Sequence, residues 1–160
     1  MSAVDQYAVV GNPIAHSKSP EIHLRFAAQV KQKIGYERIE APIDGFEEKA
    51  LSLRDAGYRG LNVTVPFKLD AAKLASELTP RARLAGAVNT LKFDGDTILG
   101  DNTDGIGFVR DVTERLGFGF GDCAVLVLGA GGAVRGLLGS LLDASPRWLA
   151  VANRSHQRAE

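Results

Sequence analysis

The chain has 160 residues, of which 24% are charged and 45% are hydrophobic, and its 19 basic residues equal its 19 acidic ones. The chain therefore has no excess of positive charge that would attract nucleic acid or anionic membranes, so we expect neither as a partner. No apolar run reaches the roughly 20 residues that a membrane span needs, and the first residues lack the features of a secretion signal. We therefore expect a soluble cytoplasmic protein.

Cysteine and histidine offer little chemistry of their own. Cys123 is the single cysteine, so it cannot form an internal disulfide, and its position in an apolar run predicts a core thiol. His16, His23 and His156 are scattered, without Cys, Asp or Glu at ligand spacing, so we expect no metal site.

The first elements in chain order are a short strand near 6–10 and a helix near 20–32. Ser19 before Pro20 predicts the N-cap and the first helical position. Capping explains Ser19 and Pro20, but it does not explain Ser17 beside them, because two hydroxyls at a helix N-terminus could also hold a carboxylate. The residues leave both interpretations open.

A strand near 35–40 and a helix near 46–56 precede a strand near 60–65 that alternates strictly. Its apolar face is formed by Leu61, Val63 and Val65. Asn62 and Thr64 share the opposite face, which predicts polar groups pointing into a ligand crevice at the end of a parallel strand. The alternative is an antiparallel strand with one wet face. Lys68 follows within one turn and could reach the same crevice.

A helix near 68–77 leads to strands near 88–93 and 97–100, joined through the turn sequence DGD at 94–96. This pair predicts a hairpin, so the first sheet is expected to be mixed. The sequences GAVNT at 86–90 and DNTDG at 101–105 are polar turns containing Asn89 and Asp104. Local side-chain bonding would explain each turn by itself.

A helix near 106–116 and a strand near 123–128 precede the sequence GAGGAVRG at 129–136, with a helix near 133–143 after it. Gly129 and Gly131 would let the chain turn sharply and let backbone amides approach a pyrophosphate at the helix N-terminus. The sequence departs from G-x-G-x-x-G, because Val134 stands at the sixth position. A glycine turn without a cofactor is the alternative.

The next strand, near 148–152, ends at Asn153, Arg154 and Ser155. NAD-binding domains usually carry an acid at this point, whereas an arginine suits the 2'-phosphate of NADP. A solvated surface arginine is the alternative for Arg154. Together with the glycine run, Arg154 favours an NADP site.

These motifs, in this order and spacing, resemble bacterial shikimate dehydrogenases of the NADP-dependent biosynthetic type. The resemblance implies reversible NADPH-dependent reduction of 3-dehydroshikimate to shikimate in the chorismate pathway to aromatic amino acids. It implies Lys68 as catalytic acid and base with Asp104 as its partner. The residues implied to hold shikimate are Ser17, Ser19, Asn62, Thr64, Lys68, Asn89 and Asp104. Those implied to hold NADP are Gly129, Ala130, Gly131, Gly132, Ala133, Asn153, Arg154, Ser155 and Arg158.

The expected fold is α/β, with residues 1–104 as a substrate-binding catalytic domain whose mostly parallel mixed sheet is covered by helices. Residues 105–160 are expected to begin a Rossmann-like NADP-binding domain that is incomplete, because such a domain needs two βαβαβ halves. The family's carboxy-terminal part, whose tyrosine and glutamine also contact substrate, is absent from these residues. Pro80 also stands where some members carry an acid near the cofactor. We therefore expect a truncated polypeptide that by itself lacks dehydrogenase activity.

Three alternatives remain. A quinate/shikimate dehydrogenase of the same superfamily would more often carry an acid near 154 and use NAD. A non-catalytic binding or regulatory module would be expected to have lost Lys68 or Asp104, and both are present. A fragment could serve only as a substrate-binding domain. The sequence leaves the oligomeric state open, a homodimer included.

Overall fold

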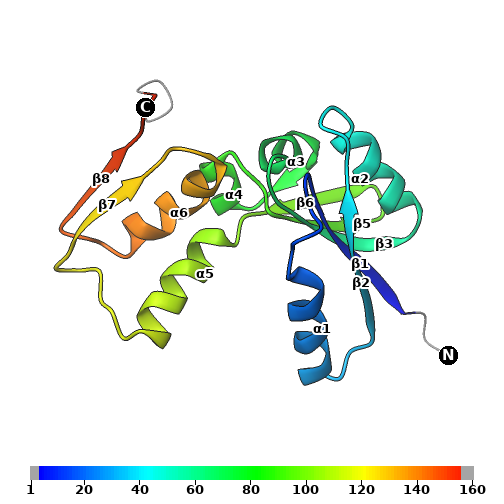
Figure 1. Cartoon of the computed structure of the whole chain (residues 1–160), viewed down its shortest axis with the longest axis horizontal. Coiled ribbons are helices and arrows are strands. Elements are labelled where there is room, and N and C mark those ends of the chain that lie inside the picture. Colours follow the sequence, from blue (N-terminus) through cyan, green and yellow to red (C-terminus); the bar gives the residue numbers. More distant parts are fainter. Residues whose placement is uncertain (1–3, 156–160) are drawn as a thin grey trace.

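The structure is a computed structural model that describes residues 4–155. It contains a six-stranded sheet in the order β2-β1-β3-β5-β6-β4 and a two-stranded sheet of β7 and β8 (Figure 1). The strands are β1 (Asp5–Gly11), β2 (Ile34–Glu40), β3 (Tyr58–Val63), β4 (Glu77–Leu78), β5 (Thr90–Asp94), β6 (Thr97–Asp101), β7 (Ala124–Leu128) and β8 (Trp148–Ala152).

Helices cover both faces of the larger sheet. The α-helices are α1 (Ser19–Gln29), α2 (Phe46–Asp55), α3 (Lys68–Leu74), α4 (Pro80–Ala85), α5 (Asp104–Arg110) and α6 (Gly132–Asp143), and a π-helical turn, η1 (Asp111–Arg115), continues α5. In Figure 1, α1 lies on one side of the sheet, and α2 and α3 lie on the other. No helix within residues 4–155 is long and apolar enough to cross a membrane.

The pairing of strands makes the larger sheet mixed. β1 pairs in parallel with β2 and β3, whereas β5 pairs antiparallel with β3 and β6, and β4 pairs in parallel with β6. β5 and β6 form the hairpin expected around Gly95, whose φ of +59° is the conformation that favours glycine in such a turn. The expected α/β class, with a mixed sheet covered by helices, is confirmed.

The core lies between the larger sheet and the helices α2 and α3. Alternation in β3 places Leu61 and Val63, each 2% exposed, in this core, where the rings of Phe46 and Phe67 stack with centroids 5.1 Å apart. Asn62 therefore lies on the opposite face, toward α1. The expectation for Val65 is wrong, because the strand ends at Val63 and Val65 is 67% exposed.

Two further expectations are wrong. The N-cap of α1 is Lys18, without a side-chain capping bond, and Ser19 is the first helical residue. The Ser19 hydroxyl instead accepts a hydrogen bond from Ser17. Cys123 is not a core thiol: it precedes β7, is only half-buried, and its sulfur donates to the Gly119 carbonyl oxygen (3.4 Å).

β4 and α4 were not expected from the sequence. Thr79 caps α4 by accepting from the Ala82 amide (3.3 Å), Pro80 is its first residue, and Gly86 ends it with φ of +58°. These are the residue types that begin and end helices, but α4 is too short for a hydrophobic repeat to reveal it. Pro80 and α4 face α6 across a cavity of about 240 Å³.

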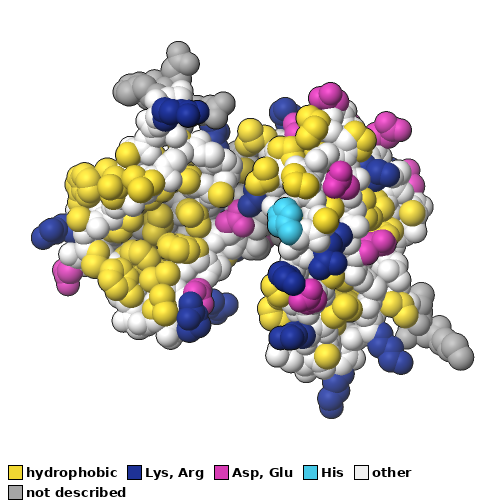
Figure 2. Space-filling view, in the orientation of Figure 1, with side chains coloured by type: hydrophobic (Ala, Val, Ile, Leu, Met, Phe, Trp, Pro, Cys, Tyr) yellow, Lys and Arg dark blue, Asp and Glu magenta, His cyan; other side chains and the backbone are white. Residues whose placement is uncertain are grey.

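The smaller sheet forms a parallel unit with α6, in the order β7, α6, β8. Figure 2 shows hydrophobic side chains gathered over this part of the molecule. Exposed apolar side chains here include Leu126 (58%), Leu128 (76%) and Trp148 (54%). α6 packs against α5 and α4, and this contact joins the smaller sheet and α6 to the part of the molecule that contains the larger sheet.

Asp101, at the end of β6, fastens α4 to the larger sheet. Its carboxylate accepts from Arg81 through both oxygens, from the Thr79 hydroxyl (2.6 Å) and from the Asn102 amide (2.8 Å). The Arg81 guanidinium lowers the pKa of Asp101 below its ordinary value, and the hydrogen bonds from Thr79 and Asn102 act in the same direction. A carboxylate with a lowered pKa stabilises the fold above its unfolded-state pKa, and this contribution is lost as the pH falls through the folded-state value.

We predict that Asp101→Asn lowers the free energy of unfolding at pH 7 by about 1–3 kcal/mol, because it removes charge-assisted hydrogen bonds. The difference from the parent should shrink below about pH 4, because there the carboxyl of the unfolded chain becomes protonated before that of the folded chain. Urea denaturation at both pH values measures it. Asp111→Asn is the matched control, because Asp111 also accepts from an arginine, Arg115, but on an exposed surface, and should change stability less. Equal stability of Asp101→Asn and the parent at pH 7 would show that the Asp101 carboxylate does not stabilise the contact between α4 and the larger sheet.

Candidate active site

Functional side chains collect at one edge of the larger sheet. β1, β3 and β6 end at this edge, while the antiparallel β5 begins there, so residues 12–19, 64–68, 89 and 102–104 converge. α3 begins with Lys68 and α5 begins with Asp104. The edge therefore receives side chains from segments that are distant in sequence.

Lys68 and Asp104 form an ion pair at this edge. The Lys68 Nζ lies 2.5 Å from Asp104 Oδ2, and the two side chains are 15% and 25% exposed. The other ion pairs described in residues 4–155 are mostly on exposed surfaces, such as Lys73 with Asp70 in the same helix as Lys68. A partly buried ammonium that is paired with one carboxylate can donate a proton to a molecule bound beside it.

Asn89 connects this pair to the sheet. Its Nδ2 donates to Asp104 Oδ1 (2.8 Å) and to Thr103 Oγ1 (3.0 Å). Its Oδ1 accepts from Thr90 Oγ1 (2.9 Å) and from the Thr103 amide (3.0 Å). Because every partner is satisfied in one orientation of the amide, Asn89 fixes the Asp104 carboxylate beside Lys68.

The remaining groups expected to hold substrate lie around the same edge. Asn62 Nδ2 donates to Thr90 Oγ1 (3.3 Å), and Ser17 Oγ donates to Ser19 Oγ (3.1 Å) at the start of α1. Thr64 directly follows β3, and its amide donates to the Val10 carbonyl oxygen (2.9 Å). These side chains are hydroxyls and amides, which suit recognition of a small molecule rich in hydroxyl groups.

The glycine run comes close to Lys68. Gly129 has φ of +110°, which supports the need for glycine there, whereas Gly131 has φ of −86° and is extended. α6 begins at Gly132 with no side chain capping its first amides, so these N–H groups and the helix dipole are available to an anion. A Cβ placed on Gly132 would lie 3.9 Å from Lys68 Cβ. The N-terminal end of α6 is thus next to Lys68.

Glycines also allow the close approach of α5 and α6. A Cβ on Gly105 would lie 2.4 Å from the Gly136 carbonyl oxygen, and a Cβ on Gly136 would lie 2.7 Å from Asn102 Oδ1. Asn102 is 2% exposed, and its side chain bonds the Ala87 carbonyl oxygen and the Asp104 amide. Asn102 therefore contacts α6 and also holds the backbone of Asp104.

The far end of the expected nucleotide site is described only in part. Asn153 Nδ2 donates to the Ser155 carbonyl oxygen (2.7 Å), which forms a tight turn after β8. Arg154 in this turn is exposed. Arg158 lies outside the described residues. Ala130 and Ala133 belong to the loop and first turn at the start of α6.

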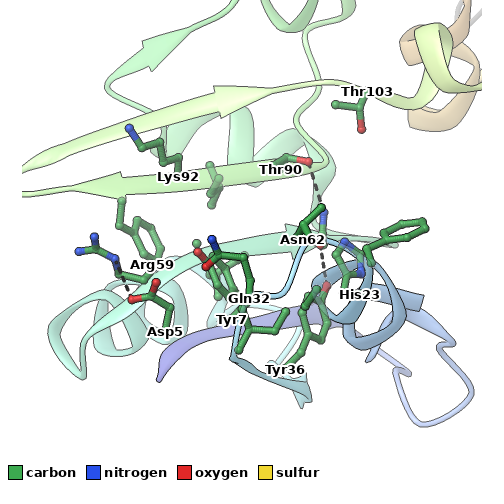
Figure 3. A pocket seen from close by; sticks show the side chains of 18 of the residues that line it. Asp5, Tyr7, His23, Gln32, Tyr36, Arg59, Asn62, Thr90, Lys92 and Thr103 are labelled. Carbon is green, nitrogen blue, oxygen red and sulfur yellow. Dashed lines mark hydrogen bonds and ion pairs between the residues drawn. The ribbon is translucent and has the colours of Figure 1, made fainter. Parts of the chain in front are cut away.

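A groove of about 810 Å³ runs along the α1 face of the larger sheet (Figure 3). Its inner end is formed by Asn62, Thr90 and Thr103, whereas Asp5, Arg59 and Lys92 lie at its outer end. Lys68 and Asp104 do not line this groove. The groove therefore adjoins the site at Asn62.

Three side chains of the site were missed by the sequence reasoning: Tyr36, Thr90 and Thr103. The two threonines stand beside Asn89 and Asp104 in the chain, and this adjacency is a signal that was available. Tyr36 carries no such signal, because it comes from the middle of a strand. Within residues 4–155 there is no group of three or more side chains suited to hold a metal ion.

Comparison with known proteins gives a family. The family model described as "Shikimate dehydrogenase substrate binding domain" matches residues 9–91, which is more than half of the chain. The chain belongs to this family. The resemblance read from the sequence motifs is thereby confirmed.

The chain is also similar to proteins named shikimate dehydrogenase (NADP(+)). That of Methylobacillus flagellatus is 55% identical over 157 residues, which are 98% of this chain and 58% of the relative. That of Nitrosospira multiformis is 57% identical over 156 residues, with coverage of 98% and 57%. A crystal structure of shikimate 5-dehydrogenase from Thermus thermophilus, in complex with NADP(H) and shikimate, matches with a TM-score of 0.89 and 34% identity, over 98% of this chain and 58% of that one. The chain spans about 58% of the length of these relatives.

Proposed function

We propose that this chain carries the substrate site and the start of the nucleotide site of an NADP-dependent shikimate dehydrogenase. Residues 1–104 would bind shikimate or 3-dehydroshikimate, and the region from residue 105 would bind NADP. The observation that carries the proposal is the position of the α6 N-terminus against Lys68, which is itself paired with Asp104. The names and complexes of the relatives support the same activity.

The chemistry follows from the charges at the site. NADPH, when bound, supplies the hydride that reduces the carbonyl carbon of 3-dehydroshikimate. Negative charge then develops on the former carbonyl oxygen, and the Lys68 ammonium donates a proton to it. Asp104 holds the ammonium through Oδ2 and is itself held through Oδ1 by Asn89. In the reverse direction, neutral Lys68 accepts the proton from the substrate hydroxyl.

The polar groups around Lys68 are proposed to orient the substrate. Ser17 and Ser19 present hydroxyls that suit its carboxylate, and Asn62, Thr64 and Asn89 suit its ring hydroxyls. The first turn of α6 fits a pyrophosphate, because its amides are uncapped and Gly131 leaves open space: nothing lies within 4 Å of a Cβ placed there. The exposed Arg154 suits a 2'-phosphate rather than free ribose hydroxyls.

We predict that Lys68→Ala lowers kcat for shikimate oxidation about 10²- to 10⁴-fold with little change in KM, because it removes the proton-transfer group. The assay follows NADPH absorbance with the complete gene product. Lys73→Ala is the matched control, since Lys73 lies in the same helix, pairs with Asp70 and is exposed. A Lys68→Ala protein with near-parental kcat would exclude Lys68 from the proton transfer.

Gly131→Ala should separate nucleotide binding from folding. The added methyl group meets no neighbour in the protein and should cost at most about 1 kcal/mol of stability, but it would obstruct close approach of a pyrophosphate. We expect the Kd for NADP, measured by calorimetric titration, to rise at least about 10-fold. Gly119→Ala, also in open space but outside the loop, is the control. Unchanged NADP affinity in Gly131→Ala would place the pyrophosphate elsewhere.

Arg154→Ala tests the choice of cofactor. Because the guanidinium can pair with the 2'-phosphate and has no such partner in NADH, the KM for NADPH should rise much more than the KM for NADH. Steady-state kinetics with both cofactors measure the two changes. Equal changes would show that Arg154 contacts another part of the nucleotide. Parallel assays with quinate and NAD test the alternative of a quinate/shikimate dehydrogenase.

A further inference from the structure

Tyr36 lies at the centre of a group of polar side chains from three elements. Its hydroxyl donates to Asn62 Oδ1 (2.6 Å). Its ring stacks on the imidazole of His23, with centroids 4.4 Å apart and planes 16° apart (Figure 3). His23 Nδ1 donates to the Ser19 carbonyl oxygen (2.8 Å), since a carbonyl oxygen can only accept. Tyr36 in β2 thus joins the start of α1 to β3.

The hydrogen bonds around Tyr36 run in one direction toward Asp104. The series begins where the Tyr36 hydroxyl donates to Asn62 Oδ1. The series continues through Asn62 Nδ2 to Thr90, through Thr90 Oγ1 to Asn89 Oδ1, and through Asn89 Nδ2 to the Asp104 carboxylate. An ionised carboxylate only accepts, so the sense of every bond before it is set.

The Asn62 amide is held at both of its ends: Nδ2 donates to Thr90 Oγ1 (3.3 Å) and to the Asn89 carbonyl oxygen (3.5 Å), and Oδ1 accepts from the Tyr36 hydroxyl (2.6 Å). An amide side chain can turn over and exchange its donor and acceptor ends, and only its partners choose between the two orientations. The Asn89 carbonyl oxygen can only accept, so it selects the orientation in which Nδ2 faces Asn89 and Thr90, and the Tyr36 hydroxyl then holds Oδ1 from the other side. Burial raises the pKa of Tyr36 well above its ordinary value, so the hydroxyl keeps its proton at neutral pH.

We propose that Tyr36 is a positioning residue of the substrate site: its ring is held against His23 and its hydroxyl holds Asn62 Oδ1, so that the Asn62 side chain meets a hydroxylated cyclic acid in one arrangement. This inference rests on the proposed shikimate dehydrogenase function. Tyr36 acts on binding through Asn62 and takes no part in proton transfer at Lys68. Its loss should therefore change KM and leave kcat nearly unaltered.

Tyr36→Phe tests the proposal, because phenylalanine keeps the ring that stacks on His23 and removes only the hydroxyl. With the complete gene product, we expect the KM for shikimate to rise about 3- to 10-fold, corresponding to loss of one net hydrogen bond, with kcat and the KM for NADP within about twofold of the parent. Because KM does not depend on the fraction of folded enzyme, the comparison holds even if the variant yields less folded protein. Tyr58→Phe is the matched control, since the Tyr58 hydroxyl bonds Glu37 at an exposed position.

A double variant separates positioning from general support of the fold. If Tyr36 acts mainly through Asn62, adding Tyr36→Phe to Asn62→Ala should raise the KM for shikimate less than it does in the parent. An equal rise in both backgrounds, or an unchanged KM in Tyr36→Phe, would overturn the inference while leaving the dehydrogenase activity in place. A parent protein that neither binds nor oxidises shikimate would overturn the proposed function and this inference together.

Discussion

The arrangement of the site depends on the antiparallel insertion of β5 between β3 and β6. This insertion reverses one strand in a sheet whose neighbours β1 and β3 are parallel, so the start of β5 lies at the edge where β3 and β6 end. Asn89 precedes β5 and thereby comes between Asn62 and Asp104. A parallel β5 would carry Asn89 to the opposite edge, and the Asp104 carboxylate would lose the donor that orients it.

The carboxylate of Asp104 sets the direction of the hydrogen bonds in the site. It is the acceptor for Lys68 and also the end of the series of hydrogen bonds that begins at the Tyr36 hydroxyl. In a partly buried setting these bonds are stronger than in water, but each polar group must also keep its partner. No buried side-chain nitrogen or oxygen in residues 4–155 is left without one. The direction of these hydrogen bonds therefore specifies the arrangement of the site. The overall charge of the chain does not, because its basic and acidic residues balance.

Glycine at a few positions decides how closely α6 approaches the Lys68–Asp104 pair. Gly105 and Gly136 let α5, α6 and Asn102 come within distances that a side chain would prevent. The same contact brings the start of α6 to Lys68. Since Asn102 also bonds the amide of Asp104, the packing of α6 and the position of the carboxylate are mechanically linked.

The sequence by itself determined the α/β class, the hairpin of β5 and β6, the glycine turn after β7 and the polar groups Asn62, Lys68, Asn89 and Asp104. These features depend on alternation, turn residues and helix starts, which neighbouring residues specify. The same reasoning was wrong for the cap at Ser19 and the burial of Cys123, because each residue lies at the boundary of an element, which a local pattern places only to within a few residues.

Only the tertiary structure decided how the polar groups are oriented. Tyr36 and Asn62 are 26 residues apart and Lys68 and Asp104 are 36 apart, so no spacing rule connects them. The amides of Asn62 and Asn89 have no intrinsic preference for either orientation. Their donor and acceptor ends are chosen by partners that arrive from other strands and helices, which is why residue type could be read from the sequence and hydrogen-bond direction could not.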